Sequence, residues 1–252
     1  MSSAQRRGTA TPAAAFEFAP GVRAAFTGRS GGVSSPPYDT LNVSGAVGDE
    51  PAAVASNRQR VAQACAVEES GLTWMRQVHG ARVGYAGSPG SSGQEVDAIF
   101  TDVPGVTLGV LAADCACVLL TDPHARIVGA AHSGREGTAA GVVTALVAAM
   151  TGQGADPARM RALIGPAICG GCYEVSAQVQ EAVAAAVPET GCRTRRGRPG
   201  LDLRAGITAQ LVSAGITQVA DDRRCTAETP DLYSFRRDGR TGRFAGLIWL
   251  AA

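Results

Sequence analysis

The feature that most constrains this sequence is a long apolar stretch over residues 106–150. It reads VTLGVLAADCACVLLTD and, after a short turn, IVGAAHSGREGTAAGVVTALVAAM. Near-continuous apolar runs rich in Val and Leu are typical of strands covered on both faces. We therefore predict one strand over residues 106–120 and a second over residues 127–131, followed by a helix over residues 138–150. Asp114, Cys115 and His132 interrupt or end these runs, so their side chains are candidates for chemistry.

The rest of the chain alternates between strand-like and helical patterns. Helical spacing of apolar residues occurs at 50–67, 175–187 and 203–214, and strand patterns occur at 16–26, 74–78, 96–100, 160–164, from 216, and at 244–250. This mixture predicts an α/β fold of the α+β type, a layered sandwich of mixed β-sheets covered by helices. We expect a single catalytic domain over residues 16–252 and a disordered tail over residues 1–15.

Composition excludes several classes of function. The net charge is +1, so there is no strong field for nucleic acid or an anionic membrane. No apolar run reaches the roughly 18 residues needed to cross a bilayer. The seven cysteines are irregularly spaced and follow no secretion signal, which indicates reduced thiols or metal ligands and a cytoplasmic protein.

Two of the three histidines end apolar strands. His79 and His132, with Cys115, are well separated in the sequence and fit a catalytic zinc site that keeps a fourth position open. The other histidine, His124, lies in a polar turn and is expected to be exposed. If Cys115 lies in a strand, alternation places Cys117 on the same face, as a second sulfur or a small apolar side chain.

A metal-free reading of the same residues stays open. Cys115 would be a nucleophile and His132 its base. Arg135, in the turn before the 138–150 helix, would supply the positive charge that a thiolate needs.

Several residues are candidates for binding substrate or phosphate. Arg29 and Asn42 lie in the Gly-, Ser- and Pro-rich residues 27–51, which form either a substrate loop or a surface linker. Arg58 would lie beside the apolar stripe of its helix, as an anion ligand or with its stem packed on the core. Tyr173 could contact a sugar or base. Arg236 begins the segment RRDGRTGR, for which a solvated hairpin turn is the alternative interpretation.

The ordered motifs TGRSGGVS..PY..LN...GD, QVHG, ADC..VLL, AAHSG, GPAI..C.YEV and YSFRRD..TGR resemble the laccase-domain purine nucleoside phosphorylases, also described as multicopper polyphenol oxidases. The resemblance covers nearly the whole chain after residue 16. It implies one Zn²⁺ per chain on His79, Cys115 and His132, phosphorolysis of adenosine, inosine and methylthioadenosine, and deamination of adenosine. It also implies a fold similar to that of cysteine hydrolases. Some bacterial relatives are linked to the editing of peptidoglycan precursors.

Copper is the second choice of metal. The same nitrogen and sulfur ligands accept it, but three histidines cannot furnish several copper centres. One departure from the family pattern concerns phosphate. Relatives read H-A-G-W-R-G after the second zinc histidine, whereas Arg135 and Glu136 stand here at the Trp and basic positions. If that basic residue binds phosphate in relatives, phosphorolysis is in question.

Three hypotheses follow. The first is a zinc-dependent enzyme acting on purine nucleosides and phosphate, with Asp114 as a candidate proton carrier. The second is a cysteine-dependent hydrolase or amidase that uses Cys115 and His132 on a peptidoglycan precursor. The third is a non-catalytic, zinc-stabilised binding domain, which would unfold when its metal is removed. The sequence leaves the oligomeric state open.

Overall fold

The computed structural model describes residues 13–251. Two mixed sheets form the centre of the molecule. The five-stranded sheet has the order β1-β2-β13-β6-β3: Phe16–Ala19, Val22–Phe26, Phe244–Leu250, Thr107–Ala112 and Leu72–Trp74. The six-stranded sheet has the order β12-β9-β7-β8-β5-β4: Gln218–Asp221, Arg161–Ile164, Ala116–Asp122, Ile127–Ser133, Ala98–Thr101 and Val83–Tyr85.

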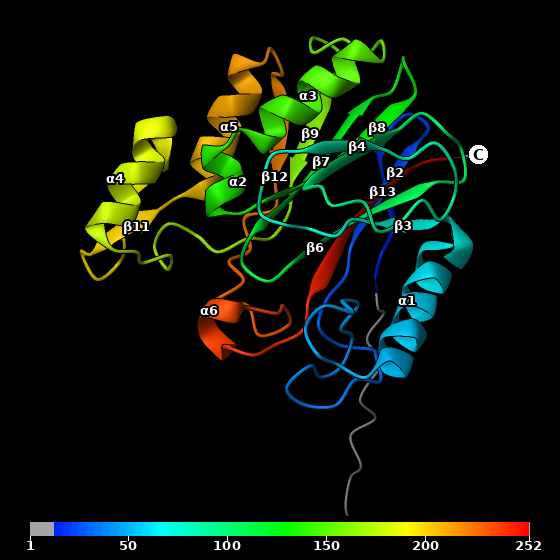
Figure 1. Cartoon of the computed structure of the whole chain (residues 1–252), viewed down its shortest axis with the longest axis horizontal. Coiled ribbons are helices and arrows are strands. Elements are labelled where there is room, and N and C mark those ends of the chain that lie inside the picture. Colours follow the sequence, from blue (N-terminus) through cyan, green and yellow to red (C-terminus); the bar gives the residue numbers. More distant parts are fainter. Residues whose placement is uncertain (1–12, 252) are drawn as a thin grey trace, which may run out of the picture.

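Helices cover the outer faces of the two sheets. The α-helices are α1 Pro51–Cys65, α2 Arg135–Ala139, α3 Val142–Gly152, α4 Ala177–Ala186, α5 Leu203–Ser213 and α6 Phe235–Asp238. Short 3-10 helices span Glu69–Gly71 and Pro188–Thr190. Figure 1 shows α1 on one side of the strands and α3 with α5 on the opposite side. The predicted layered α/β architecture of mixed sheets and helices is confirmed.

Three apolar clusters correspond to the three interfaces between these layers. Between the sheets, Val110 and Ile248 of one sheet pack with Leu119 of the other. Val61 of α1 belongs to the cluster on the outer face of the five-stranded sheet. Leu146 of α3 belongs to the cluster on the outer face of the six-stranded sheet. Because the central strands β6 and β7 are covered on both sides, their sequences are almost continuously apolar, which explains the pattern of residues 106–120.

That apolar run forms two strands in different sheets. β6 ends at Ala112 and belongs to the five-stranded sheet, whereas β7 begins at Ala116 in the six-stranded sheet. The chain crosses between the sheets through a turn in which Asp114 has a φ of 96°. Cys115 therefore lies in this turn and not within a strand. Cys117 is fully buried between the sheets. Of the two roles expected for it, it therefore has that of a small apolar side chain and not that of a second sulfur at the site.

Three other expected elements differ from the structure. The helix predicted at 138–150 is two helices, α2 and α3, because Gly141 adopts a left-handed φ of 75° between them. The strand expected at 74–78 ends at Trp74. The segment RRDGRTGR is not a hairpin: its first three residues belong to α6, which Ser234 caps by accepting a hydrogen bond from the Arg237 amide.

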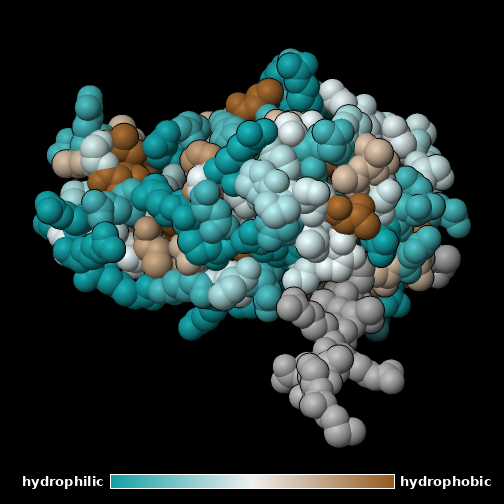
Figure 2. Space-filling model, turned by 90° about the horizontal axis from the view of Figure 1, so that it is seen from below, coloured by the Kyte–Doolittle hydropathy of each residue, from teal (hydrophilic) through white to brown (hydrophobic). Residues whose placement is uncertain are grey.

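The basic segment at residues 193–200 forms most of a hairpin, in which β10 (Gly191–Arg193) pairs with β11 (Pro199–Leu201). The tail expected at residues 1–15 falls mostly outside the described residues. Ala13 already forms an isolated bridge with Thr27, so paired structure begins before residue 16. No helix within residues 13–251 has the length and apolarity needed to cross a membrane. Figure 2 shows a largely hydrophilic face with separate apolar spots.

Candidate metal centre and active-site cavity

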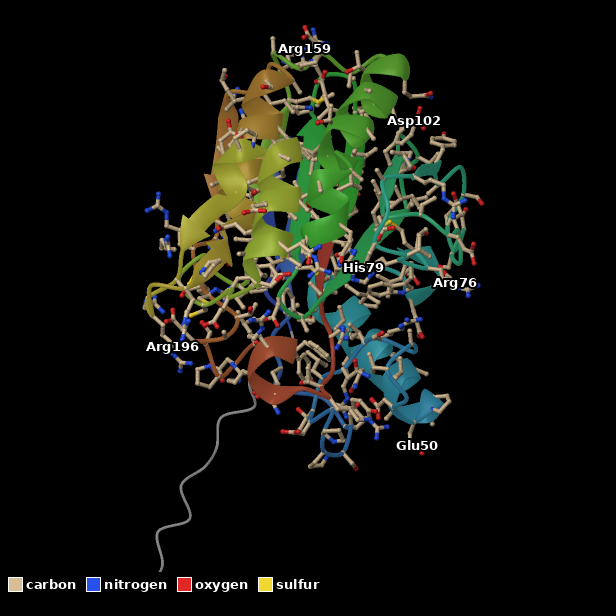
Figure 3. All side chains as sticks on the ribbon, turned by 60° about the vertical axis from the view of Figure 1, so that its left-hand side comes forward. Glu50, Arg76, His79, Asp102, Arg159 and Arg196 are labelled. Carbon is tan, nitrogen blue, oxygen red and sulfur yellow. The ribbon has the colours of Figure 1, made fainter. Side chains whose placement is uncertain are left out.

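The predicted ligands His79, Cys115 and His132 come together in the structure. His132 lies in β8, where it pairs across the strands with Cys117 of β7. This pairing places His132 beside the turn that carries Cys115, immediately before β7. His79 follows β3 in an exposed loop and has a left-handed φ of 60°. Figure 3 shows His79 near the middle of the molecule, between the helices of the upper half and α1 and α6 below.

The three donor atoms of His79, Cys115 and His132 fit a single metal ion. They all lie within 4.8 Å of one another, and the two imidazole rings meet edge to face, with centroids 4.8 Å apart. Neighbouring donors around a tetrahedral zinc ion are about 3.5 Å apart, so small side-chain movements would complete the site. Two imidazoles and one thiolate leave a fourth position for water or substrate, as catalytic zinc sites require.

Asp97 organises both histidines and was missed by the sequence analysis. Its buried carboxylate accepts a hydrogen bond from Nδ1 of His132 at 3.0 Å. The same carboxylate accepts the amide hydrogens of Val78, His79 and Gly80 at 3.1, 2.9 and 2.7 Å. It therefore fixes the His79 loop and leaves Nε2 of His132 as the metal-facing nitrogen. The one available signal was a charged residue inside the buried segment VDAIF.

The electrostatics of the site favour the thiolate form of Cys115. Burial raises the pKa of this thiol, but the charge and hydrogen bonds of His132 and His79 outweigh burial and bring the pKa to about 6. Burial lowers the pKa of His132, whereas the Cys115 thiolate and Asp97 raise that pKa to about 9. Without metal, the two shifts favour a thiolate–imidazolium pair over two neutral groups. Metal binding must release the proton from His132.

Gly134 provides the space in which the Cys115 sulfur lies. A Cβ atom on Gly134 would lie 2.8 Å from Sγ of Cys115 and 3.5 Å from Cδ2 of His79. Real Cβ atoms do not approach sulfur this closely, so any side chain here would displace the thiolate. Gly134, the glycine of the AAHSG motif, is thus required because the Cys115 sulfur lies so close to it. Its backbone does not require glycine, since a φ of −86° is open to any residue.

The three ligands open into a cavity of about 750 Å³. This volume lies within the range of small-molecule sites, roughly 300–1,000 Å³. The wall combines apolar side chains with aromatic and cationic ones, notably Tyr173, Phe235, Arg236 and Arg243. Such a wall can contact a flat base and an anion at the same time.

Tyr173 and Arg236, two of the predicted substrate residues, line this cavity. The guanidinium of Arg236 lies over the Tyr173 ring, 5.1 Å from its centroid, and donates to the carbonyl of Glu174 at 2.6 Å. Arg243, the last arginine of the same RRDGRTGR segment, lines the cavity too. Burial lowers the pKa of Arg243, and the negative charges of Cys115 and Asp114 oppose that effect. A guanidinium withdrawn from water gains much from an anionic ligand.

Arg29, Asn42 and Arg58 lie outside the cavity that residues 13–251 form. Arg29 forms ion pairs with Asp39 and Asp238. Arg58 lies over the Trp74 ring and donates to the carbonyl of Val43.

Asn42 is fully buried and cross-links the loop of residues 27–51. Its amide donates to Asp49 and to the carbonyl of Ser44, and its oxygen accepts the amide hydrogen of Arg243. This segment is thus an ordered support for the Arg243 strand, and Figure 1 shows it beside α6.

Asp114 lines the cavity, but its carboxylate is engaged elsewhere. It accepts hydrogen bonds from the hydroxyls of Thr226 and Ser234 at 2.6 and 2.7 Å and from the amide of Arg236 at 2.6 Å. The residue therefore anchors the segment that carries Arg236 and holds the turn beside Cys115. The other cavity-lining carboxylate is Glu136, which forms an ion pair with Arg135.

Comparison with known proteins agrees with this architecture. A Neisseria meningitidis protein of family-model DUF152 superposes with a TM-score of 0.86 at 34% sequence identity, covering 96% of this chain and all of that one. YlmD from Geobacillus stearothermophilus superposes with a TM-score of 0.87 at 32% identity, covering 92% of this chain and 93% of that one. These similarities place the layered fold in a known structural group.

Sequence relatives cover the same range. Purine nucleoside phosphorylase ORF3 of Streptomyces griseus is 49% identical over 229 residues, which is 90% of this chain and 93% of the relative. A purine nucleoside phosphorylase of Deinococcus radiodurans is 42% identical, over 90% of this chain and 88% of the relative. The matching family model spans residues 23–251, so the chain belongs to the family described as multi-copper polyphenol oxidoreductase laccase, whose purine nucleoside phosphorylase members resemble it throughout.

Proposed function

We propose that this protein is a zinc-dependent purine nucleoside phosphorylase, which cleaves adenosine, inosine and methylthioadenosine with phosphate and also deaminates adenosine. One observation carries the proposal: the His79, Cys115 and His132 donors open into a cavity that also presents Tyr173 and Arg243. The relatives' names as purine nucleoside phosphorylases support the substrate class.

Zinc fits the donor set better than copper does. Two imidazoles and a thiolate with one open position are the ligands of a catalytic zinc ion. The chain has three histidines, and His124 lies exposed in a turn away from the cavity wall. The remaining two cannot build the several copper centres of a multicopper oxidase.

Different side chains of the cavity would bind the purine and the phosphate. A purine ring can stack on Tyr173, which faces the cavity below the Arg236 guanidinium. Phosphate can take charge-assisted hydrogen bonds from Arg243 and Arg236. Both arginines belong to the YSFRRD..TGR segment. The cavity therefore has cationic groups for phosphate even though Arg135 and Glu136 replace the Trp and basic residue of the family pattern.

In phosphorolysis, a phosphate oxygen forms a bond to C1′ of the ribose while the N-glycosidic bond breaks. The electron pair of that bond passes to the purine, which then takes a proton. In deamination, water adds at C6 and ammonia leaves, so a proton must move from water to the amine. A bound zinc ion would supply Lewis acidity and activate water at neutral pH.

Glu136 is the cavity carboxylate suited to carry protons. Burial raises its pKa, but the ion pair with Arg135 outweighs burial and keeps the pKa below its usual range. Glu136 is therefore ionised at neutral pH and can accept a proton from water or the substrate. Asp114, whose oxygens already accept three hydrogen bonds, holds the turn instead.

The direct test is an assay of adenosine and inosine with zinc-loaded protein, with and without phosphate. We expect hypoxanthine and ribose 1-phosphate from inosine only when phosphate is present, and inosine from adenosine in either case. Glu136→Gln should slow deamination more than it weakens nucleoside binding. Zinc-loaded, folded protein that converts neither nucleoside would contradict the proposal.

A second candidate function is supported by the lowered pKa of Cys115. A thiolate paired with His132 is also what a cysteine hydrolase or amidase uses, here on a peptidoglycan precursor. Iodoacetamide distinguishes the two. In a zinc enzyme, bound metal protects Cys115 and activity disappears with the metal. In a cysteine enzyme, activity survives metal removal and disappears on alkylation.

A further inference from the structure

A second group of metal-type ligands lies outside the site described above. The sulfurs of Cys169, Cys172 and Cys225 and a carboxylate oxygen of Glu228 all lie within 4.8 Å of one another. The three cysteines are free thiols. We propose that these four side chains bind a second Zn²⁺ ion, which has a structural role.

The spacing of the four ligands is that of a zinc site built from two turns. Two residues separate Cys169 from Cys172, and two residues separate Cys225 from Glu228. Paired C-x-x-C units joined by a longer segment are a recognised zinc-binding pattern, and here a glutamate takes the place of the last cysteine. The long intervening segment explains why the pattern does not stand out in the sequence.

The two turns have the same backbone hydrogen bonding. The carbonyl of Cys169 accepts the amide hydrogens of Cys172 and Tyr173 at 2.9 and 3.0 Å. The carbonyl of Cys225 accepts the amide hydrogens three and four residues later, from Glu228 at 3.1 Å and the next residue at 2.9 Å. Each turn therefore directs its first and fourth side chains toward the same point, which is the geometry that a shared ion needs.

Hydrogen-bond donors contact two of the three sulfurs, although burial and the neighbouring cysteines raise the pKa of the Cys172 thiol to about 11. The amide of Cys169 donates to Sγ of Cys225 at 3.3 Å, which links the two turns across the site. Nη1 of Arg195 donates to Sγ of Cys172 at 3.1 Å, and the same guanidinium forms an ion pair with Glu228. Three thiolates and a carboxylate carry four negative charges, so a divalent ion leaves two, and Arg195 offsets one of these.

The ligand set selects zinc among the common metals. Thiolates exclude Mg²⁺ and Ca²⁺, which prefer oxygen ligands. Copper(I) prefers sulfur ligands, so the carboxylate of Glu228 favours zinc. Four protein ligands close the coordination shell, which is typical of structural rather than catalytic zinc.

The second site adjoins the cavity without being part of it. None of its four ligands lines the cavity formed by residues 13–251. Arg196, the chain neighbour of Arg195, lies at the edge of the molecule in Figure 3, well apart from His79.

The bound ion would join two segments that shape the cavity wall. The first turn leads directly into Tyr173, which lines the cavity, and the second contains Thr226, whose hydroxyl donates to Asp114. The amide of Ile168, just before the first turn, donates to the carbonyl of Asp114 at 2.9 Å. A second zinc would therefore stabilise the wall that carries Tyr173.

The test is the zinc content of protein purified under reducing conditions, counted per chain by mass spectrometry. We expect two zinc ions in the wild type, and one each in His79→Ala and in Cys172→Ser. Cys65→Ala, which removes a cysteine from the distant helix α1, should keep both. Co²⁺ bound to His79→Ala should show the visible absorption of a tetrahedral thiolate site.

A milder variant guards against misfolding of the cysteine mutant. Glu228 is exposed, so Glu228→Ala should fold normally and release its second zinc at a chelator concentration at least about tenfold lower than the wild type. One zinc in the wild type together with none in folded His79→Ala would overturn the second site. A Cys169–Cys172 disulfide in zinc-saturated, reduced protein would overturn it as well.

Discussion

The carboxylate of Asp97 receives the Nδ1 hydrogen of His132 at 3.0 Å and, through the amides of the neighbouring loop, also sets the position of His79. One buried side chain thus orients two of the three candidate metal ligands, although all three come from different parts of the chain. The third candidate, Cys115, lies in the turn by which the chain passes from one sheet to the other. The cluster of donors is therefore a product of the fold's two-sheet construction.

Replacing Asp97 should weaken metal binding without removing any ligand. In Asp97→Asn, the amide NH₂ cannot accept the hydrogen bonds that the His79 loop now donates. We expect metal affinity to fall by about 10–100-fold. The free energy of unfolding should fall by about 1–3 kcal/mol, because the partly buried amides of the His79 loop lose a charged acceptor. Competition with a zinc chelator and chemical denaturation measure the two effects.

The half-buried Asp102 provides the control for this variant, because its carboxylate accepts hydrogen bonds from Tyr85 and Gln153 away from the site. Asp102→Asn should bind zinc as the wild type does. Equal zinc affinities for Asp97→Asn and Asp102→Asn would show that the Asp97 hydrogen bonds do not orient the ligands.

Adding one methyl group at Gly134 should displace the Cys115 sulfur. In Gly134→Ala, the new Cβ would lie 2.8 Å from Sγ. We expect a loss of the first metal ion and of activity while the far-ultraviolet circular dichroism stays unchanged. Gly152→Ala is the matched control, since a Cβ there meets no atom within 4 Å. Normal zinc content in Gly134→Ala would contradict the close approach.

Removing the charge of Arg243 should weaken phosphate binding. In Arg243→Gln, we expect the KM for phosphate to rise by about 10–100-fold, the range that one charge-assisted hydrogen bond supplies. The KM for inosine should change much less. Arg60→Gln, on the exposed face of α1, should leave both constants unchanged. A KM for inosine that rises as much as that for phosphate would instead place Arg243 at the nucleoside.

Asp122 should make the fold sensitive to acid. Burial raises the pKa of this carboxyl, but hydrogen bonds from the amides of Asp156 and Ala125 and from Arg159 outweigh burial and hold the pKa below its usual range. A carboxyl with a lowered folded-state pKa contributes stability above its unfolded pKa of about 3.9 and loses that contribution as the pH falls through the folded value.

Asp122→Asn should therefore be less stable than the wild type at pH 7, by about 1–3 kcal/mol. The difference should shrink as the pH is lowered below about 4. Urea denaturation at several pH values measures it. Glu17→Gln, at an exposed position of β1, is the control and should show no such trend. A stability difference that is constant across the pH range would contradict the role of the Asp122 charge.

Sequence reasoning picked out the candidate ligands that the structure brings together, because strand-end histidines and a cysteine inside an apolar run are chemically conspicuous. It missed Asp97 because a single aspartate beside a strand looks the same whether it is buried or solvated. It did not separate Arg58 from Arg243, since both are arginines near apolar residues. Tertiary structure decides that one lies on Trp74 and the other faces the cavity.

The largest error in the fold prediction has a similar cause. Residues 106–120 look like one strand region because strands of both sheets are covered on both faces and are equally apolar. The left-handed φ of Asp114 that separates β6 from β7 is unusual for a residue other than glycine, so no local signal marks the turn. The break at Gly141 did have a local signal, because glycine readily adopts a left-handed φ. The apolar periodicity on both sides of Gly141 nevertheless favoured one continuous helix.

The measurement that tests the central claim most directly is a zinc titration of phosphate-dependent inosine cleavage. Metal-free protein, checked for folding, would be resupplied with zinc in steps, and the rate would be measured beside that of His79→Ala. The account predicts no cleavage without zinc, recovery as zinc is bound, and no recovery in His79→Ala. Full activity in the metal-free wild type would contradict it.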